Sequence, residues 1–236
     1  QPIYNTDDDS LSGAEALIRW NSRKYGFIGP NTFIPLLEDS ALIIPLGRWI
    51  INTAAKACNR WITSIPDFVM HINLSFVQIV KSNIVKDVLE NIERYSAANN
   101  HYVFEITETI EMDQIPAVQN VFKEFVKNEF RFAIDDFGTG YSNYGYMRDR
   151  TFDIVKVDRS FVTDIDKLKD NYLMVSFIIK MAHEMGLHVC IEGVETKEEL
   201  SCVKKLGADY IQGYYYGKPV CLQDFEEQHL KRFVLG

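Results

Sequence analysis

Residues 153–192 read DIVKVDRSFVTDIDKLKDNYLMVSFIIKMAHEMGLHVCIE and contain a strand, a helix and a second strand, in that order. Asp153–Val157 and His188–Glu192 are short apolar runs typical of strands. Between them, apolar residues recur three and four positions apart, as on one face of a helix, at Met174, Ile178, Met181, Ala182 and Met185. Gly186 then ends the predicted helix. Two strands joined through a helix predict a parallel pair.

The same alternation of strands and helices continues toward both ends of the chain. Further strands are predicted at Pro2–Tyr4, Ala14–Arg19, Val69–Leu74, Tyr102–Thr107, Arg131–Asp136 and Ala208–Ile211. Eight strands in one α/β domain of this length favour a TIM-like (β/α)8 barrel, and a doubly wound open sheet is the competing topology. About nine residues, Asn5 to Gly13, separate the first two strands. That is too few for a crossover helix, so the first strand is predicted to be antiparallel.

The composition is that of an ordinary folded protein, with 236 residues, 47% hydrophobic and 25% charged, and a net charge of −8. These values exclude disorder and argue against unaided binding of duplex nucleic acid, which needs a basic face. No apolar run reaches the roughly 18 residues of a membrane span, so we expect no membrane contact by this domain. The four cysteines form no CxxC pair, which favours reduced thiols and a cytoplasmic protein.

Neither an internal repeat nor a linker divides the chain, so residues 1–236 are predicted to form a single domain. The sequence begins at Gln1, inside an apolar stretch and without a methionine. We therefore expect it to be a fragment of a larger protein, which can itself be tethered to a membrane.

Polar residues lie near the carboxyl ends of several predicted strands, where a barrel core should be apolar. They are Glu15, Asn73, Glu105, Asp135, Lys156 and Glu192. Each alone is more often a cap, a turn residue or a surface charge. In a barrel, however, all strand carboxyl ends converge on one mouth, so these six groups would share a small space. Carboxylates so close together repel one another unless cations lie among them.

The residue types indicate hard cations. Oxygen ligands without His or Cys favour Mg²⁺ or Mn²⁺ over zinc, and the five histidines lack ligand spacing. Adjacent strand residues point to opposite faces, so Asp135 and Asp136 reach one site only where the strand ends and bends, at Phe137-Gly138-Thr139-Gly140. Such an aspartate pair can bridge two metals about 4 Å apart. Glu15, Leu17 and Arg19 would share one strand face, with Arg19 placed to bind phosphate or a guanine edge.

Together these segments resemble the EAL family, phosphodiesterases that hydrolyse the bacterial second messenger cyclic di-GMP. The name-giving motif stands here as Glu15-Ala16-Leu17, followed by Ile18-Arg19-Trp20. The other matching segments, in order, are Gln1-Pro2-Ile3, Phe33-Ile34-Pro35, Asn73-Leu74-Ser75, Glu105-Ile106-Thr107-Glu108, Asp135-Asp136-Phe137-Gly138-Thr139-Gly140-Tyr141-Ser142, Val155-Lys156-Val157-Asp158, Glu192-Gly193-Val194-Glu195 and Gln212-Gly213-Tyr214.

The resemblance implies a role for each matched residue. It implies that the first cation is held by Glu15, Asn73, Glu105 and Asp135. Asp135 would also bind a second cation, together with Asp136, and Glu192 would be bound directly or through water. It further implies that Lys156 polarises the attacking water and that Glu192 is the candidate general base. Glu108 would anchor the loop after Phe137, and Leu17, Arg19 and Gln212 would contact the nucleotide. Glu195 would support the ligand residues without binding a cation itself. The product would be linear pGpG.

The resemblance also implies partners. It implies a homodimer that forms through the loop after Phe137 and the helix beyond it. It also implies fused GGDEF or sensor domains outside residues 1–236. The chain departs from the family at Asn143 and Tyr144, where Ser and Leu are usual, and at Arg150-Thr151, where Leu-Pro is common. The alternatives are a catalytically silent cyclic di-GMP receptor, a structural barrel and, from the residues alone, a glycosidase with two carboxylates.

Overall fold

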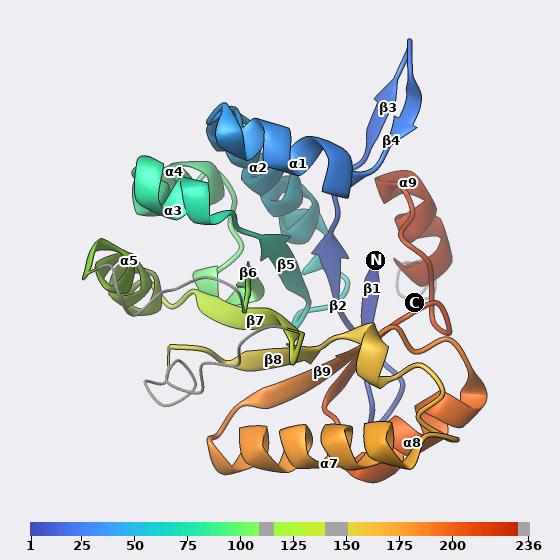
Figure 1. The fold of residues 1–236 in the computed structure, drawn as a ribbon. Helices are drawn as coiled ribbons and strands as arrows, with labels where there is room; N and C mark the ends of the chain where they lie inside the picture. The colour runs from blue at the N-terminus through green and yellow to red at the C-terminus, as the bar shows by residue number, and fades with distance from the viewer. Residues whose placement is uncertain (109–115, 140–150, 231–236) are drawn as a thin grey trace.

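Eight strands close into a barrel in a computed structural model that describes residues 1–108, 116–139 and 151–230 (Figure 1). In order around the barrel the strands are β1 (Pro2–Asn5), β10 (Tyr210–Gln212), β9 (His188–Glu192), β8 (Ile154–Val157), β7 (Arg131–Phe137), β6 (Tyr102–Thr107), β5 (Val69–Asn73) and β2 (Leu11–Ala16). The predicted TIM-like (β/α)8 barrel is confirmed, and the open sheet is excluded because β1 closes the ring between β10 and β2.

Strand β1 runs antiparallel to both of its neighbours, as predicted from the short connection to β2. All other neighbouring barrel strands are parallel. The carboxyl ends of β2 and of β5 to β10 therefore open toward the same end of the barrel.

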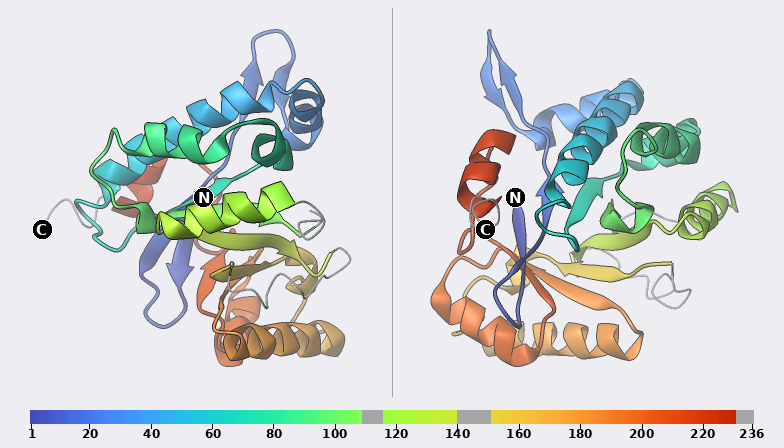
Figure 2. Two further views of the ribbon diagram at one scale, coloured as in Figure 1. Left: turned by 90° about the vertical axis from the view of Figure 1, so that its left-hand side faces the viewer. Right: turned by 180° about the vertical axis from the view of Figure 1, so that it is seen from behind.

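Helices surround the barrel (Figures 1 and 2). They are α1 (Pro30–Asp39), α2 (Ile43–Trp61), α3 (Phe76–Lys81), α4 (Ile84–Ile92), α5 (Pro116–Lys127), α7 (Lys169–Glu184), α8 (Lys197–Leu206) and α9 (Leu222–Phe225), with short helical turns at Asn99–His101, Arg159–Phe161 and Glu226–Leu230. Helix α7 ends before Gly186 and buries Val175, Ile178, Ile179 and Ala182, whereas Met174 is exposed. Within the described ranges, no helix combines the length and the apolar character needed to cross a bilayer.

An apolar layer inside the barrel supports the mouth. It consists of Ile3, Val103, Ala133, Ile154 and Cys190, which form a cluster separate from the main core. Because side chains alternate along a strand, the next inward position of β6 to β9 lies two residues later. Those positions are Glu105, Asp135, Lys156 and Glu192. The strands thus place a charged layer directly above an apolar one.

Strand β2 differs from the prediction. It spans Leu11–Ala16 rather than Ala14–Arg19, and a hairpin of β3 (Trp20–Ser22) and β4 (Gly26–Ile28) follows it. Ser12-Gly13, the second and third residues of β2, resemble a loop in sequence, but Gly13 lets the backbone of β5 approach closely. A Cβ at Gly13 would lie 2.3 Å from the carbonyl oxygen of Val69. Leu17 and Arg19 therefore lie beyond the strand, and the prediction that they share a strand face with Glu15 is wrong.

A histidine–aspartate cluster links α7, β9 and the start of β10 at the opposite end of the barrel. Asp209 lies 2.9 Å from Nε2 of His183 and 3.3 Å from Nδ1 of His188, and it accepts a hydrogen bond from the Val189 amide. Burial by itself raises the pKa of Asp209, but these donors outweigh it and lower the pKa to about 2.

We expect Asp209→Asn to reduce the free energy of unfolding at pH 7 by at most about 2 kcal/mol. Because the pKa of Asp209 is lower in the folded state, its contribution is present above pH 4 and disappears as the pH falls toward 2. Urea unfolding of both proteins between pH 2 and 7 should show curves that converge in acid. The exposed Asp67→Asn is the control, and a difference independent of pH would contradict the assignment.

Candidate active site at the barrel mouth

The ammonium group of Lys156 lies at the centre of the barrel mouth, inside a ring of carboxylates. Its Nζ is 2.8 Å from Glu105 Oε2, 2.7 Å from Glu192 Oε1, 3.0 Å from Asp135 Oδ1 and 3.4 Å from Glu15 Oε2. The lysine side chain is fully buried. The prediction that these strand ends converge is therefore correct, and the alternative of an outward surface charge for Lys156 is excluded.

Charge pairing and burial shift the pKa of Lys156 in opposite directions. Burial alone lowers the pKa of Lys156, but the surrounding carboxylates raise it well above its ordinary value, which keeps the ammonium charged. Burial and the nearby Glu15 raise the pKa of Glu105 well above the usual range. Burial also raises the pKa of Glu192, to about 7. The cluster thus holds more negative charge than one ammonium balances, which favours additional cations.

Glu15, near the end of β2, is held by amide side chains from both flanks. Asn73 Nδ2 donates to Glu15 Oε1 and Gln212 Nε2 donates to Glu15 Oε2, each at 2.6 Å. Burial raises the pKa of Glu15, but Lys156 and the two amides outweigh it and lower the pKa to about 2. Gln212, predicted to contact the nucleotide, is buried here and orients Glu15.

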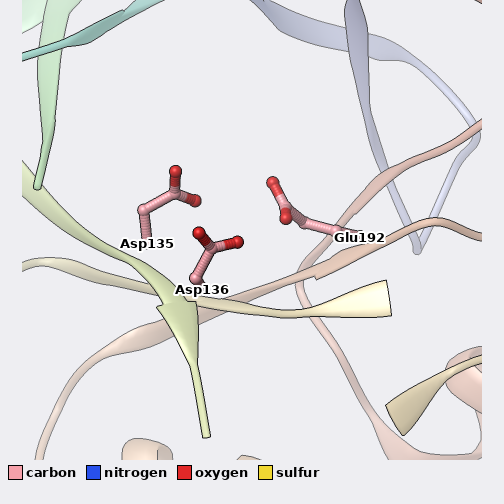
Figure 3. Close-up of side chains that lie close together, drawn as sticks. All are labelled: Asp135, Asp136 and Glu192. Atoms are coloured by element: carbon pink, nitrogen blue, oxygen red, sulfur yellow. The ribbon is translucent and has the colours of Figure 1, made fainter. Parts of the chain in front are cut away.

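Asp135, Asp136 and Glu192 form a compact oxygen cluster (Figure 3). One carboxylate oxygen from each lies within 4.8 Å of the other two. The adjacent aspartates reach one site because Asp136 adopts a left-handed φ of 53° and the register between β7 and β8 shifts between Ile134 and Phe137. This is the bend predicted for the strand end. Burial, and then Asp135, raise the pKa of Asp136.

The donor set fits divalent cations. The predicted ligand atoms are hard oxygens, and the buried Asp135 Oδ1 has the Lys156 ammonium 3.0 Å away but makes no hydrogen bond. Asn73 lies exposed at the rim beside Glu15, while Glu15 and Glu105 lie deeper, around Lys156. The predicted ligands therefore fall into an outer trio, Asp135, Asp136 and Glu192, an inner pair beside the lysine, Glu15 and Glu105, and Asn73 at the rim.

The loop after β7 is tied to β6. The carboxylate of Glu108 accepts a hydrogen bond from the Gly138 amide at 2.9 Å, which matches its expected position as the loop anchor. Gly138 has a φ of 97°, and a Cβ there would lie 2.7 Å from the Phe161 ring. The rest of the predicted loop motif, Gly140-Tyr141-Ser142, and the departures at Asn143, Tyr144 and Arg150 lie outside the described residues.

A cavity of about 420 Å³ adjoins Glu15 on the outer side of β2. Leu17 and Arg19 line it together with residues of α2 and the Pro219–Leu222 segment. Arg19 is exposed and donates to the carbonyl of Ile18. Glu195 is also exposed, and its backbone amide donates to the carboxylate of Glu199, the capping-box residue of α8. The structure thus places Leu17 and Arg19 beside Glu15 at the mouth.

His71 lies at the inner end of the site, although the histidines show no ligand spacing in the sequence. Its Nδ1 lies 2.7 Å from Glu105 Oε1, and its side chain is buried. The sequence pattern that indicates this position is its spacing on β5, two residues before Asn73 and therefore on the same inward face.

The chain was compared with known proteins. Residues 1–219 match the family model described as the EAL domain. The chain is 32% identical over 225 residues to the probable cyclic di-GMP phosphodiesterase PdeG of Escherichia coli, covering 95% of this chain and 44% of PdeG. It is also 32% identical over 223 residues to the cyclic di-GMP phosphodiesterase PdeL of E. coli, covering 93% of this chain and 61% of PdeL. The chain thus spans less than two thirds of either curated relative.

Solved structures of EAL proteins superpose closely on this chain. The cAMP- and cyclic-di-GMP-bound form of the EAL enzyme Bd1971 superposes with a TM-score of 0.91 at 36% identity, over 96% of this chain and 62% of that one. The cyclic di-GMP complex of the PaMucR phosphodiesterase superposes with a TM-score of 0.89 at 29% identity, over 95% of this chain and 92% of that one. The closed barrel, the charged mouth and the match over residues 1–219 lead to one conclusion. This chain belongs to the EAL domain family.

Proposed function

We propose that this chain is a metal-dependent phosphodiesterase that hydrolyses cyclic di-GMP to linear pGpG. The observation that carries the proposal is the buried Lys156 among four carboxylates, beside the Asp135–Asp136–Glu192 trio. Relatives named as cyclic di-GMP phosphodiesterases, and family structures bound to that nucleotide, support the choice of substrate. The complete set of polar groups favours the enzyme over a silent receptor.

Two divalent cations, Mg²⁺ or Mn²⁺, would be held by Glu15, Asn73, Glu105, Asp135, Asp136 and Glu192. When bound, such ions lower the pKa of water and offset charge on phosphate oxygens. Lys156 would donate to the attacking water and then face the negative charge that develops on the phosphoryl group. Glu192 would accept a proton from that water as the general base. The water oxygen would bond to phosphorus as the bond to one ribose oxygen breaks. The departing oxygen would take up a proton from solvent to become a hydroxyl, which opens the ring.

Substrate contacts would come from Leu17, Arg19 and Gln212. The exposed guanidinium of Arg19 can bind a phosphate or a guanine edge, and Leu17 lies in the adjoining cavity. Gln212 would act partly through Glu15, which it already contacts at 2.6 Å.

The test is turnover of cyclic di-GMP by the unmodified chain with Mg²⁺ and with Mn²⁺, with pGpG followed by chromatography. We expect pGpG with at least one metal and none after chelation with EDTA. If the chain binds the nucleotide but produces no pGpG with either metal, it is a receptor and the proposed function is wrong.

The oligomeric state, the cellular location and the length of the whole protein stay predictions. We expect a single domain that forms a homodimer in the cytoplasm, within a longer signalling protein. Exposed apolar side chains on α7, among them Leu173 and Phe177, support contact with a second copy. Sedimentation at several concentrations should show a dimer, and a monomer throughout would contradict the expectation.

A further inference from the structure

The inner part of the mouth contains a hydrogen bond that joins two neighbouring strands. His71 on β5 lies beside Val103 in the parallel register with β6, so Glu105, two residues later on β6, lies diagonally across from it. The imidazole Nδ1 is 2.7 Å from Glu105 Oε1. The exposed fractions are 4% for His71 and 1% for Glu105, which leaves little access for competing water.

The direction of this bond follows from the role of Glu105. A carboxylate that binds a cation is ionised and can only accept hydrogen bonds, so His71 Nδ1 must carry the hydrogen. The other oxygen, Oε2, accepts from Lys156 Nζ at 2.8 Å. Each oxygen of Glu105 therefore has a partner on a different strand, β5 or β8. These two partners together define the orientation of the carboxylate plane.

From this geometry we infer that His71 is a positioning residue for the cation site, which acts by holding Glu105 in its ligating orientation. The inference rests on the proposed function, in which Glu105 is a ligand. Hydrogen bonds to ligating carboxylates raise metal affinity because they orient the ligand before the metal binds. Without the imidazole, Glu105 Oε1 loses this hydrogen bond, and the carboxylate is held less firmly in its orientation.

The test measures Mn²⁺ binding to the purified chain by calorimetry, without nucleotide. His71→Leu keeps an apolar side chain of similar size but lacks the donor, and we expect it to weaken Mn²⁺ binding about 10- to 100-fold. His71→Asn places an amide donor near the position of Nδ1, and we expect it to bind Mn²⁺ within about threefold of the unmodified chain. Glu105→Gln removes the ligand itself and should weaken binding at least as much as His71→Leu.

His101→Leu is the matched control, because His101 Nδ1 contacts the carbonyl of Phe68, away from the mouth. A purely structural role predicts equal Mn²⁺ affinity for the Leu and Asn variants, and that result would overturn the inference. Unchanged binding in Glu105→Gln would overturn it as well. If His71→Leu does not fold, His71→Val, which is too short to reach Glu105, takes its place.

These outcomes are read from metal binding alone. Absence of pGpG with the unmodified chain would defeat the proposed function, yet the ranking of the His71 variants in Mn²⁺ affinity would still be measurable. The two proposals can therefore fail separately.

Discussion

Lys156→Met is expected to lower the rate of pGpG formation about 10²- to 10³-fold at saturating Mn²⁺, because it removes the buried donor that faces the developing phosphoryl charge. Methionine keeps the length and the apolar stem of the side chain, so loss of packing contributes little. The measurement is the initial rate of cyclic di-GMP hydrolysis. A rate within threefold of the unmodified chain would contradict the role of Lys156.

The same variant should be unstable without metal. Its four partners, Glu15, Glu105, Asp135 and Glu192, would face one another without the ammonium. Removing one partner from a buried ion cluster typically costs about 3–5 kcal/mol, which urea unfolding at pH 8 can measure. Bound Mn²⁺ would replace part of the lost positive charge, so we expect it to stabilise this variant more than the unmodified chain. Lys180→Met, on the exposed surface of α7, is the matched control and should change neither quantity.

Asp135→Asn should have an effect of similar size, but through the cations. Asp135 belongs to the oxygen trio and also lies 3.0 Å from Lys156, so it connects the outer and inner parts of the site. An amide lacks the negative charge and has one acceptor oxygen instead of two. A loss of about 4 kcal/mol of transition-state stabilisation corresponds to a roughly 1,000-fold slower reaction.

Two measurements on Asp135→Asn distinguish weaker Mn²⁺ binding from a changed cation position. Calorimetry should show weakened Mn²⁺ binding, and the hydrolysis rate should stay low when Mn²⁺ is raised, because the remaining ligands hold the cation in a different position. Asp67→Asn is the control, since Asp67 is exposed and lines a cavity at the opposite end of the barrel. Normal Mn²⁺ affinity in Asp135→Asn would exclude Asp135 as a ligand.

The barrel was predictable because its signals are local. Strand–helix alternation appears within windows of a few residues, and the short connection after β1 implied its antiparallel direction. Strand β2 was displaced in the prediction because Ser12-Gly13, its second and third residues, lack apolar character. What makes it a strand is the close approach of β5 at Gly13, a contact between residues far apart in the chain.

In the candidate site too, local sequence pattern decided some features and long-range contacts decided others. The sequence by itself determined which residues reach the mouth, because an inward position recurs every second residue and the polar side chains at Glu105, Asp135, Lys156 and Glu192 follow apolar ones. Tertiary structure alone decided their pairing: Lys156 among four carboxylates, Gln212 on Glu15, and His71 on Glu105. Those contacts depend on the stagger between neighbouring strands and on closure of the ring, and local periodicity contains neither.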